Sequence, residues 1–342
     1  MGKIRNIADL EESLSRPTPG AIETLRRLEG DFIVLGAAGK MGPSLARMIR
    51  QGLDAIGAPA RRVLAVSRFS SPRAMAHFAE NGVQPIACDL LDREAVRALP
   101  DAVNVLYLAG QKFGTRIAPE MTWAMNTLAP VHVAERYARS RIVVFSTACV
   151  YSLAAVDGPG SREEDPLAPP GEYANSCVGR ERIFAYFSRR HGTPMLFYRL
   201  SYALDLRYGV LRDVAQSVWE GRPVDVTMGY VNVIWQGDAN ARAIQCLDHA
   251  ACPPMALNVT GQERVSIRSL ALRFGELLGR TPVIAGQESS TAWLFDAGRS
   301  YELFGPPLVL LEEVIESTAQ WVRDGGESLG KPTHFEAHDG RF

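Results

Sequence analysis

The feature that most constrains the fold of this chain is a short apolar run that leads directly into three evenly spaced glycines. Residues 32–35 read Phe-Ile-Val-Leu, and Gly36, Gly39 and Gly42 follow at intervals of three. Apolar residues then recur at helical spacing between positions 45 and 49. This pattern is typical of a buried parallel strand, a tight turn and a helix whose N-terminus faces the turn.

Each glycine of this turn has its own physical role. Gly36 permits the turn, Gly39 lets a pyrophosphate approach the backbone, and Gly42 lets the helix pack closely against the strand. The free N–H groups and the positive end of the helix dipole then attract phosphate groups. The sequence therefore predicts a dinucleotide-binding turn with contacts from Gly36, Ala38, Gly39, Lys40, Met41 and Gly42.

The bulk composition excludes several classes of protein. The 342 residues, 46% of them hydrophobic, suffice for one large α/β unit and a smaller lobe. The net charge of -1 gives no support for a nucleic-acid or membrane-surface partner, and no apolar run reaches membrane-spanning length. The N-terminus has no apolar signal segment. The scattered cysteines and histidines lack metal-ligand spacing, so we expect no metal site, reduced thiols and a cytoplasmic location.

Strand and helix patterns alternate along the first 200 residues. Apolar strand patterns occur at 62–67, 84–90, 103–110, 141–147 and 195–200. This alternation predicts an α/β fold with a Rossmann-type, doubly wound parallel sheet, whose ligand crevice lies at the carboxyl ends of the strands. We expect four segments: an N-terminal helical extension (1–30), a dinucleotide-binding domain (31–200), a smaller α/β substrate lobe (201–325) and a loose polar tail (326–342).

The residues that close the second strand bear on the choice of cofactor. An acidic residue there would hold the ribose 2′-hydroxyl of NAD, but this chain has Ser67 followed by Arg68. A carboxylate repels a 2′-phosphate, whereas a guanidinium binds one through charge-assisted hydrogen bonds. The sequence therefore favours NADP over NAD. The alternative is that Arg68 is only a solvated surface side chain.

Further candidate cofactor contacts follow the third and fourth strands. Asp89 and Leu90 are placed to frame an adenine, whereas Asp92 is placed to cap the next helix. The fourth strand ends in residues past which a cofactor backbone can run, namely Leu108, Ala109 and Gly110.

The order of these pieces resembles the extended short-chain dehydrogenase/reductase family, the sugar-nucleotide epimerases and dehydratases. The resemblance covers about residues 31–323. It rests on the glycine turn, Cys88-Asp89-Leu90, Leu108-Ala109-Gly110, Asn126, and the segments 145–151, 164–166 and 257–261. It implies an NAD(P)-dependent oxidoreductase or epimerase that transfers hydride at a hydroxyl or carbonyl carbon of a small substrate, such as a nucleotide sugar. Proteins of this type are commonly homodimers.

The resemblance also implies a catalytic hydroxyl and a catalytic tyrosine. By register against Val150-Tyr151 the hydroxyl is Thr147, and the tyrosine is Tyr173. The family's lysine, four residues after the tyrosine, is replaced here by Cys177. A lysine there favours the phenolate, because residues i and i+4 share a helix face, and it also holds the nicotinamide ribose. A neutral thiol at this cofactor position does neither.

Several explanations of this departure remain open. Lys112, after the fourth strand, is the preferred substitute cation, and Arg180 is a second candidate. Alternatively, Tyr173 acts only as a neutral acid beside Thr147, or the protein binds its cofactor without turnover, as a sensor or partner subunit. For Cys177 itself, a small packing residue is at least as good an interpretation as any active role.

Overall fold

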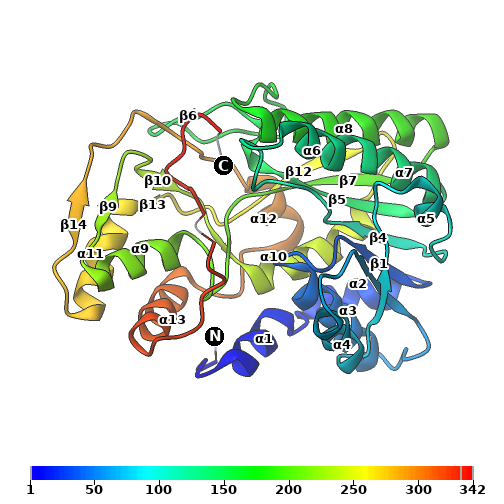
Figure 1. Cartoon of the computed structure of the whole chain (residues 1–342), viewed down its shortest axis with the longest axis horizontal. Coiled ribbons are helices and arrows are strands. Elements are labelled where there is room, and N and C mark those ends of the chain that lie inside the picture. Colours follow the sequence, from blue (N-terminus) through cyan, green and yellow to red (C-terminus); the bar gives the residue numbers. More distant parts are fainter. Residues whose placement is uncertain (1, 332, 341–342) are drawn as a thin grey trace.

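The computed structural model describes residues 2–331 and 333–340, and a seven-stranded parallel sheet forms its larger lobe (Figure 1). The strand order is β12-β7-β5-β4-β1-β2-β3. The strands are β1 (Phe32–Leu35), β2 (Val63–Ser67), β3 (Gln84–Ala87), β4 (Asn104–Tyr107), β5 (Arg141–Thr147), β7 (Met195–Leu200) and β12 (Met255–Val259). The chain order reverses at β1, so the ligand crevice is expected at the carboxyl ends of β1 and β4. The predicted Rossmann-type fold is confirmed.

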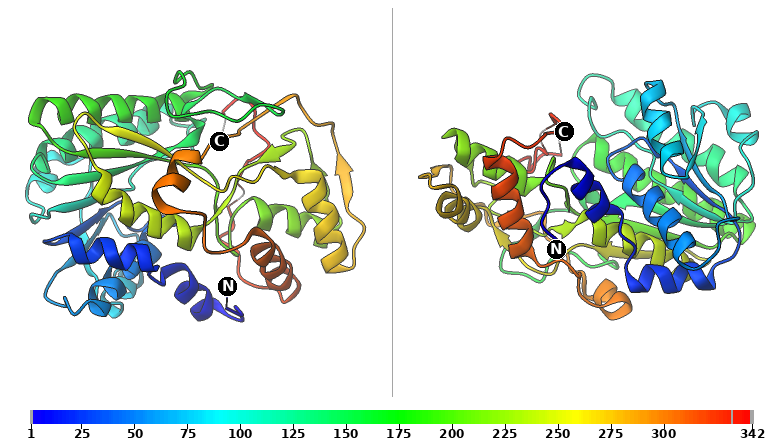
Figure 2. Two further views of the ribbon diagram at one scale, coloured as in Figure 1. Left: turned by 180° about the vertical axis from the view of Figure 1, so that it is seen from behind. Right: turned by 90° about the horizontal axis from the view of Figure 1, so that it is seen from below.

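Two layers of helices cover this sheet (Figures 1 and 2). One layer contains α2 (Pro19–Arg27), α3 (Gly42–Ala55), α4 (Pro72–Glu80) and α10 (Gln236–Gln245). The other contains α5 (Arg93–Arg97), α6 (Pro119–Trp123), α7 (Ala129–Arg136) and α8 (Glu172–His191). Because both faces are covered, all four residues of β1 are buried, which explains the unbroken apolar run in the sequence.

The N-terminal extension, expected to be helical, forms two helices, α1 (Ile7–Ser15) and α2. Thr18 caps α2 by accepting a hydrogen bond from the N–H of Ala21, and Pro19 occupies the first turn, where a missing N–H costs nothing. Leu10, Leu14 and Leu25 are fully buried. Both helices pack against α3 and α10, so the extension belongs to the core of its own chain.

The helical segment between β4 and β5 is interrupted by a single π-helical turn. This turn, η1 (Ala124–Leu128), lies between α6 and α7. Pro130 lacks the N–H that would bond to the carbonyl of Asn126 in a regular α-helix, which accounts for the change in pairing. Such bulges often mark functional sites, and this one carries Asn126.

The smaller lobe packs α9 (Val210–Glu220), α11 (Ile267–Leu278) and α13 (Leu311–Arg323) around short strand pairs, whereas α12 (Gly298–Phe304) lies against β12 of the larger lobe. These pairs are β6 (Ala154–Ala155) with β15 (Thr291–Ala292), β8 (Ala203–Leu204) with β11 (Ile234–Trp235), β9 (Pro223–Asp225) with β14 (Val283–Ala285), and β10 (Tyr230–Val231) with β13 (Val265–Ser266). Between these elements the chain returns to the larger lobe, where it forms α10 and β12. The described helices include none with the length and apolar character that a membrane crossing requires.

Residues 333–340 are packed against the rest of the chain, so the prediction of a loose tail is wrong for them. Phe335 is buried, and the indole N–H of Trp293 donates to the carbonyl of Ala337 at 3.1 Å. Thr333 donates two hydrogen bonds to Asp213. These partners lie 44 and 120 residues away in the chain, so local composition did not reveal them.

Candidate active site

The glycine turn between β1 and α3 leaves a shallow cradle of bare backbone. Gly36 has a φ of +85°, and a Cβ there would lie 2.6 Å from the backbone of Ala109. A Cβ on Gly42 would lie 2.1 Å from the carbonyl oxygen of Ala37. A Cβ on Gly39 would meet only the Gly36 carbonyl, at 3.3 Å, and would project from the open turn. The turn therefore fits the diphosphate of a dinucleotide.

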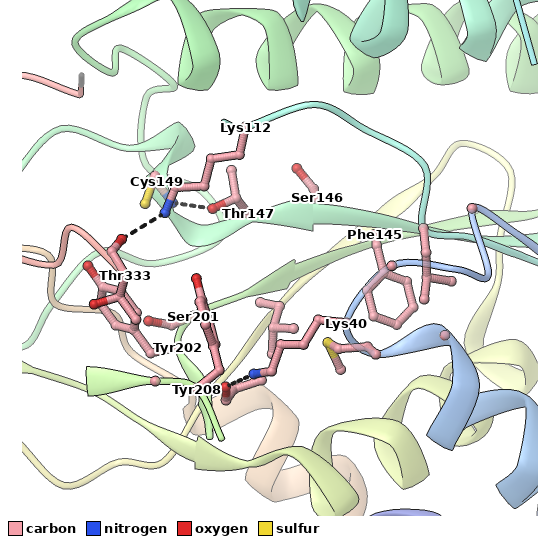
Figure 3. Close-up of a pocket in the computed structure, with 18 of the residues that line it drawn as sticks. Lys40, Lys112, Phe145, Ser146, Thr147, Cys149, Ser201, Tyr202, Tyr208 and Thr333 are labelled. Carbon is pink, nitrogen blue, oxygen red and sulfur yellow. Dashed lines mark hydrogen bonds between the residues drawn. The ribbon is translucent and has the colours of Figure 1, made fainter. Parts of the chain in front are cut away.

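A cavity of about 290 Å³ adjoins this turn at the carboxyl ends of β4, β5 and β7 (Figure 3). Its lining includes the three residues expected to be catalytic: Lys112, Thr147 and Tyr173. It also includes Gly36, Gly39, Lys40, Met41, Gly42 and Leu108 from the predicted cofactor set. Among the described lining residues there are two lysines and no aspartate, glutamate or histidine, so the cavity favours an anionic ligand.

Thr147 is the last residue of β5 and lies partly exposed to this cavity. Its hydroxyl oxygen accepts a hydrogen bond from the N–H of Cys149 at 3.2 Å. The hydroxyl can therefore serve both as a local cap and, through its own proton, as a donor to a ligand. Figure 3 shows the Lys112 ammonium pointing toward Thr147 and Cys149.

Tyr173 lies in the first turn of α8, partly exposed to the same cavity. Burial raises the pKa of its phenol well above 10, and the Cys177 thiol adds to this shift. The Arg180 guanidinium acts in the opposite direction on that pKa. At neutral pH the phenol is therefore protonated in the free protein.

Lys112 reaches the cavity from the loop after β4. Burial lowers the pKa of its ammonium, while Cys149, Cys177 and Glu336 act to raise it. The ammonium donates to the carbonyl of Thr333 at 3.3 Å (Figure 3). Lys112, the preferred substitute for the missing lysine, therefore lines the same cavity as Tyr173.

Lys40 contributes a side chain to the cavity, whereas the sequence predicted only its place in the turn. Its ammonium donates to the carbonyl of Ala203 and lies 4.6 Å from the ring centre of Tyr208. Burial lowers the pKa of Lys40 to about 8, although Asp205 acts to raise it. A lone lysine within an otherwise small and apolar turn was the available signal in the sequence.

Cys177 is fully buried and packs into the hydrophobic core of the smaller lobe. It is not among the described residues that line the cavity, so its predicted contact with the cofactor has no support in this geometry. Burial also raises the pKa of its thiol, which is therefore neutral. The arrangement matches the packing interpretation of this residue.

Arg180 and Asn126 form a buried network beneath the cavity. The Arg180 guanidinium donates to the carbonyl of Phe145 at 2.8 Å and to the side-chain oxygen of Asn126. Asn126 also accepts from the N–H of Gln111 at 3.0 Å. A Cβ on Gly110 would lie 2.3 Å from the guanidinium, so this glycine makes room for Arg180. The network fixes the loop that carries Lys112.

The part of the site that is expected to bind the adenosine of the cofactor is more exposed than the catalytic cavity. Ser67 is half-buried and Arg68 is exposed. Asp89 accepts a hydrogen bond from the N–H of Leu91 at 3.0 Å, which turns the chain after β3. Leu90 and Ala109 are buried in the layer below. Asp92 caps α5 by accepting from two N–H groups, which confirms that prediction.

A larger cavity of about 830 Å³ lies on the outer side of the glycine turn. Its lining includes Ala38, Gly39 and Gly110 from the predicted cofactor set, together with the side chain of Arg73. The two cavities share Gly39, Lys40, Lys112 and Tyr208. A bound dinucleotide can therefore extend along the turn from one cavity to the other. No cluster of histidine, cysteine, aspartate or glutamate suited to a metal ion occurs among the described residues.

A Rossmann-type sheet with a bare glycine turn, beside a cavity lined by Thr147 and Tyr173, is typical of a dinucleotide-binding protein. The sequence profile of the NAD dependent epimerase/dehydratase family matches residues 32–204. The chain belongs to this family, so it is a member of an enzyme family that uses a nicotinamide dinucleotide.

Solved structures with the same fold include three informative relatives. MoeE5 in complex with UDP-glucuronic acid and NAD is 21% identical, with a TM-score of 0.68 over 86% of this chain and 100% of the other. UDP-glucose 4-epimerase from Thermus thermophilus in complex with NAD is 20% identical, with a TM-score of 0.68 over 86% and 99%. dTDP-glucose 4,6-dehydratase from Bacillus anthracis in complex with NAD is 16% identical, with a TM-score of 0.73 over 86% and 97%. No curated protein matches the chain by sequence.

Proposed function

We propose that this protein is an NADP-dependent oxidoreductase or epimerase that acts on a hydroxyl or carbonyl carbon of a nucleotide sugar or a related small molecule. One observation carries the proposal: Lys112, Thr147 and Tyr173 line a single cavity that also contains the glycine turn. The complexes of MoeE5 with UDP-glucuronic acid and with UDP-glucose support a nucleotide sugar as the substrate class.

The cavity residues divide the work of orientation and proton transfer. When bound, the nicotinamide ring supplies or accepts the hydride. The Thr147 hydroxyl, whose oxygen already accepts from Cys149, donates its proton in a hydrogen bond to the substrate oxygen. Tyr173 exchanges a proton with that oxygen, and the Lys112 ammonium supplies the positive charge that the family obtains from its lysine. Because its raised pKa keeps the phenol protonated at neutral pH, Tyr173 is present in the form that can donate a proton to a carbonyl oxygen.

The catalytic assignment is tested by comparing two substitutions. We expect Tyr173→Phe and Lys112→Ala each to lower turnover by roughly 100-fold, the usual loss for a missing proton-transfer group. NADPH affinity, measured by fluorescence titration, should change by less than the turnover rate does. Lys3→Ala, at the distant N-terminus, serves as the control. An unchanged rate in Lys112→Ala would remove the proposed role of that lysine.

The choice of NADP rests on Ser67 and Arg68 at the end of β2. The exposed guanidinium of Arg68 is available to a 2′-phosphate there. We expect NADPH to bind roughly tenfold more tightly than NADH, and Arg68→Ala to abolish the difference. Arg139 is an exposed arginine that precedes β5, at the end of the sheet opposite to Arg68. Arg139→Ala should leave the difference in affinity between NADPH and NADH unchanged. Equal affinities for NADPH and NADH in the parent protein would contradict the assignment.

A second candidate function is a cofactor-binding protein without turnover, acting as a sensor or partner subunit. The burial of Cys177 beside Tyr173 favours it, because a neutral thiol does not help to form the phenolate. The two functions differ in a simple assay. A protein that binds NADPH but leaves it unconsumed across a panel of nucleotide sugars and carbonyl compounds has this second function.

Assembly and compartment complete the proposal. Met121, Trp123, Leu128 and Tyr186 expose apolar surface on the face formed by α6, η1 and α8, which supports a homodimer joined there. The five cysteines are free thiols, which supports a reducing compartment such as the cytoplasm.

A further inference from the structure

The segment after α13 crosses the opening between the two lobes. We call this segment the strap and define it as residues 327–331 and 333–340. In Figure 1 it is the red trace that leaves α13 and runs toward β6. Near its start the N–H of Leu329 donates to the carbonyl of Arg207 at 3.1 Å. Near its end the carbonyl of Ala337 accepts from the indole of Trp293, so both ends are attached to the smaller lobe.

The middle of the strap is attached by a buried pair. Thr333 is 1% exposed and donates to one oxygen of Asp213 from its N–H, at 2.9 Å, and from its hydroxyl, at 2.6 Å. Burial raises the pKa of Asp213, and the two hydrogen bonds from Thr333 oppose that rise. The carboxylate thus depends on Thr333 for its stabilisation, and this pair is the central attachment of the strap.

The strap lies across from the glycine turn in both cavities of the site. Thr333 lines the catalytic cavity together with Gly39 and Lys40, and Figure 3 shows it on the side away from Lys40. Leu329 and Lys331 line the outer cavity, which the same turn residues also border. A diphosphate held at the turn would therefore lie beneath the strap.

The strap also contacts the proposed catalytic machinery. The carbonyl of Thr333 accepts the hydrogen bond from the Lys112 ammonium at 3.3 Å. The position of the strap and the orientation of this cation are therefore linked through one residue.

We propose that the strap is a lid that retains the dinucleotide, and that the cofactor leaves only after Thr333 separates from Asp213. This inference rests on the proposed function, because it requires a cofactor at the glycine turn. It gives the Thr333–Asp213 pair a role in the rate of cofactor release, separate from the chemistry at Tyr173.

The test measures the rate of NADPH dissociation. Protein loaded with NADPH is mixed with excess NADP+ in a stopped-flow instrument, and the loss of NADPH fluorescence gives the rate. Thr333→Val keeps the shape of the side chain but removes the hydroxyl donor, and we expect release to be roughly five- to tenfold faster. Ser328→Ala is the matched control, because among the described residues its hydroxyl oxygen accepts only from the N–H of Gly330 within the strap. Its release rate should equal that of the parent.

Two further measurements keep the proposal falsifiable. If Thr333→Val does not fold cooperatively, Asp213→Asn tests the same attachment from the other side and should also speed release. In hydrogen exchange, the strap amides should be better protected when NADPH is bound. Equal release rates in parent and variants, or unchanged protection, would overturn the lid and leave the proposed function standing. A parent protein that binds neither NADPH nor NADH would overturn the proposed function and the lid together.

Discussion

At the scale of single residues, Lys40 combines a cost for folding with a benefit for ligand binding. Burial lowers the pKa of Lys40 from its ordinary 10.5 to about 8. A folded-state pKa below the unfolded one means that the buried ammonium opposes folding below pH 8. This opposition fades as the pH rises toward 10.5, because the unfolded chain then binds more protons than the folded one.

This balance gives a prediction with opposite signs for stability and binding. We expect Lys40→Met to raise the free energy of unfolding at pH 7 by about 1–2 kcal/mol, a figure reduced for the partial exposure of the side chain to the cavity. The gain should disappear near pH 10, as followed by denaturant unfolding. The same variant should bind NADPH roughly tenfold more weakly at pH 7, because one cation near the diphosphate is lost. A variant that gains no stability, or that keeps its affinity, would contradict this account.

Single residues were predictable where their chemistry depends on neighbours in sequence. The glycine turn and the cap at Asp92 follow from local spacing, and both are found. The environments of Cys177 and Arg180 were not predictable, because they depend on tertiary contacts such as the one between Arg180 and Asn126, which lie 54 residues apart in the chain. The side chain of Lys40 contacts Ala203, 163 residues away, and local spacing says nothing of such a contact.

At the scale of elements, two glycines in the turn between β1 and α3 have different roles. Gly42 is needed for the packing of α3, and Gly39 is needed for ligand binding. Gly42→Ala would place a Cβ 2.1 Å from a backbone oxygen, so we expect a loss of about 1–3 kcal/mol in the free energy of unfolding. Gly39→Ala meets one oxygen at 3.3 Å and should change stability little. It should weaken NADPH binding at least tenfold, because the methyl group occupies the phosphate cradle. Thermal unfolding and fluorescence titration of both variants check this, and similar losses of stability would contradict it.

Element boundaries show the limits of local patterns. Six strands of the central sheet were predicted, most of them because burial on both faces produces unbroken apolar runs. The seventh, β12, lies in the segment that we expected to form the smaller lobe. The π-helical turn between α6 and α7 depends on Pro130, and apolar periodicity does not detect it. The smaller lobe was predicted only coarsely, because most of its strands are two or three residues long.

At the scale of the whole molecule, the larger lobe is assembled from distant parts of the chain. β12 pairs with β7 along five residues, and α10 buries Ala239, Ala243 and Ile244 against the same sheet. A fragment of residues 1–200 would lack both elements. We expect it to aggregate and to show no cooperative thermal transition, because β7 would become a bare edge beside uncovered apolar surface. A soluble fragment with a sharp transition would contradict this view.

The late arrival of β12 also affects the protein during its synthesis. A ribosome releases the chain from the N-terminus at roughly 5–20 residues per second, so β7 emerges several seconds before its outer neighbour. β12, which completes the sheet, emerges only after α9 and the short strands β8 to β11 have emerged. Nascent chains paused in this interval expose an unpaired strand, and we expect them to be the species that most requires chaperones.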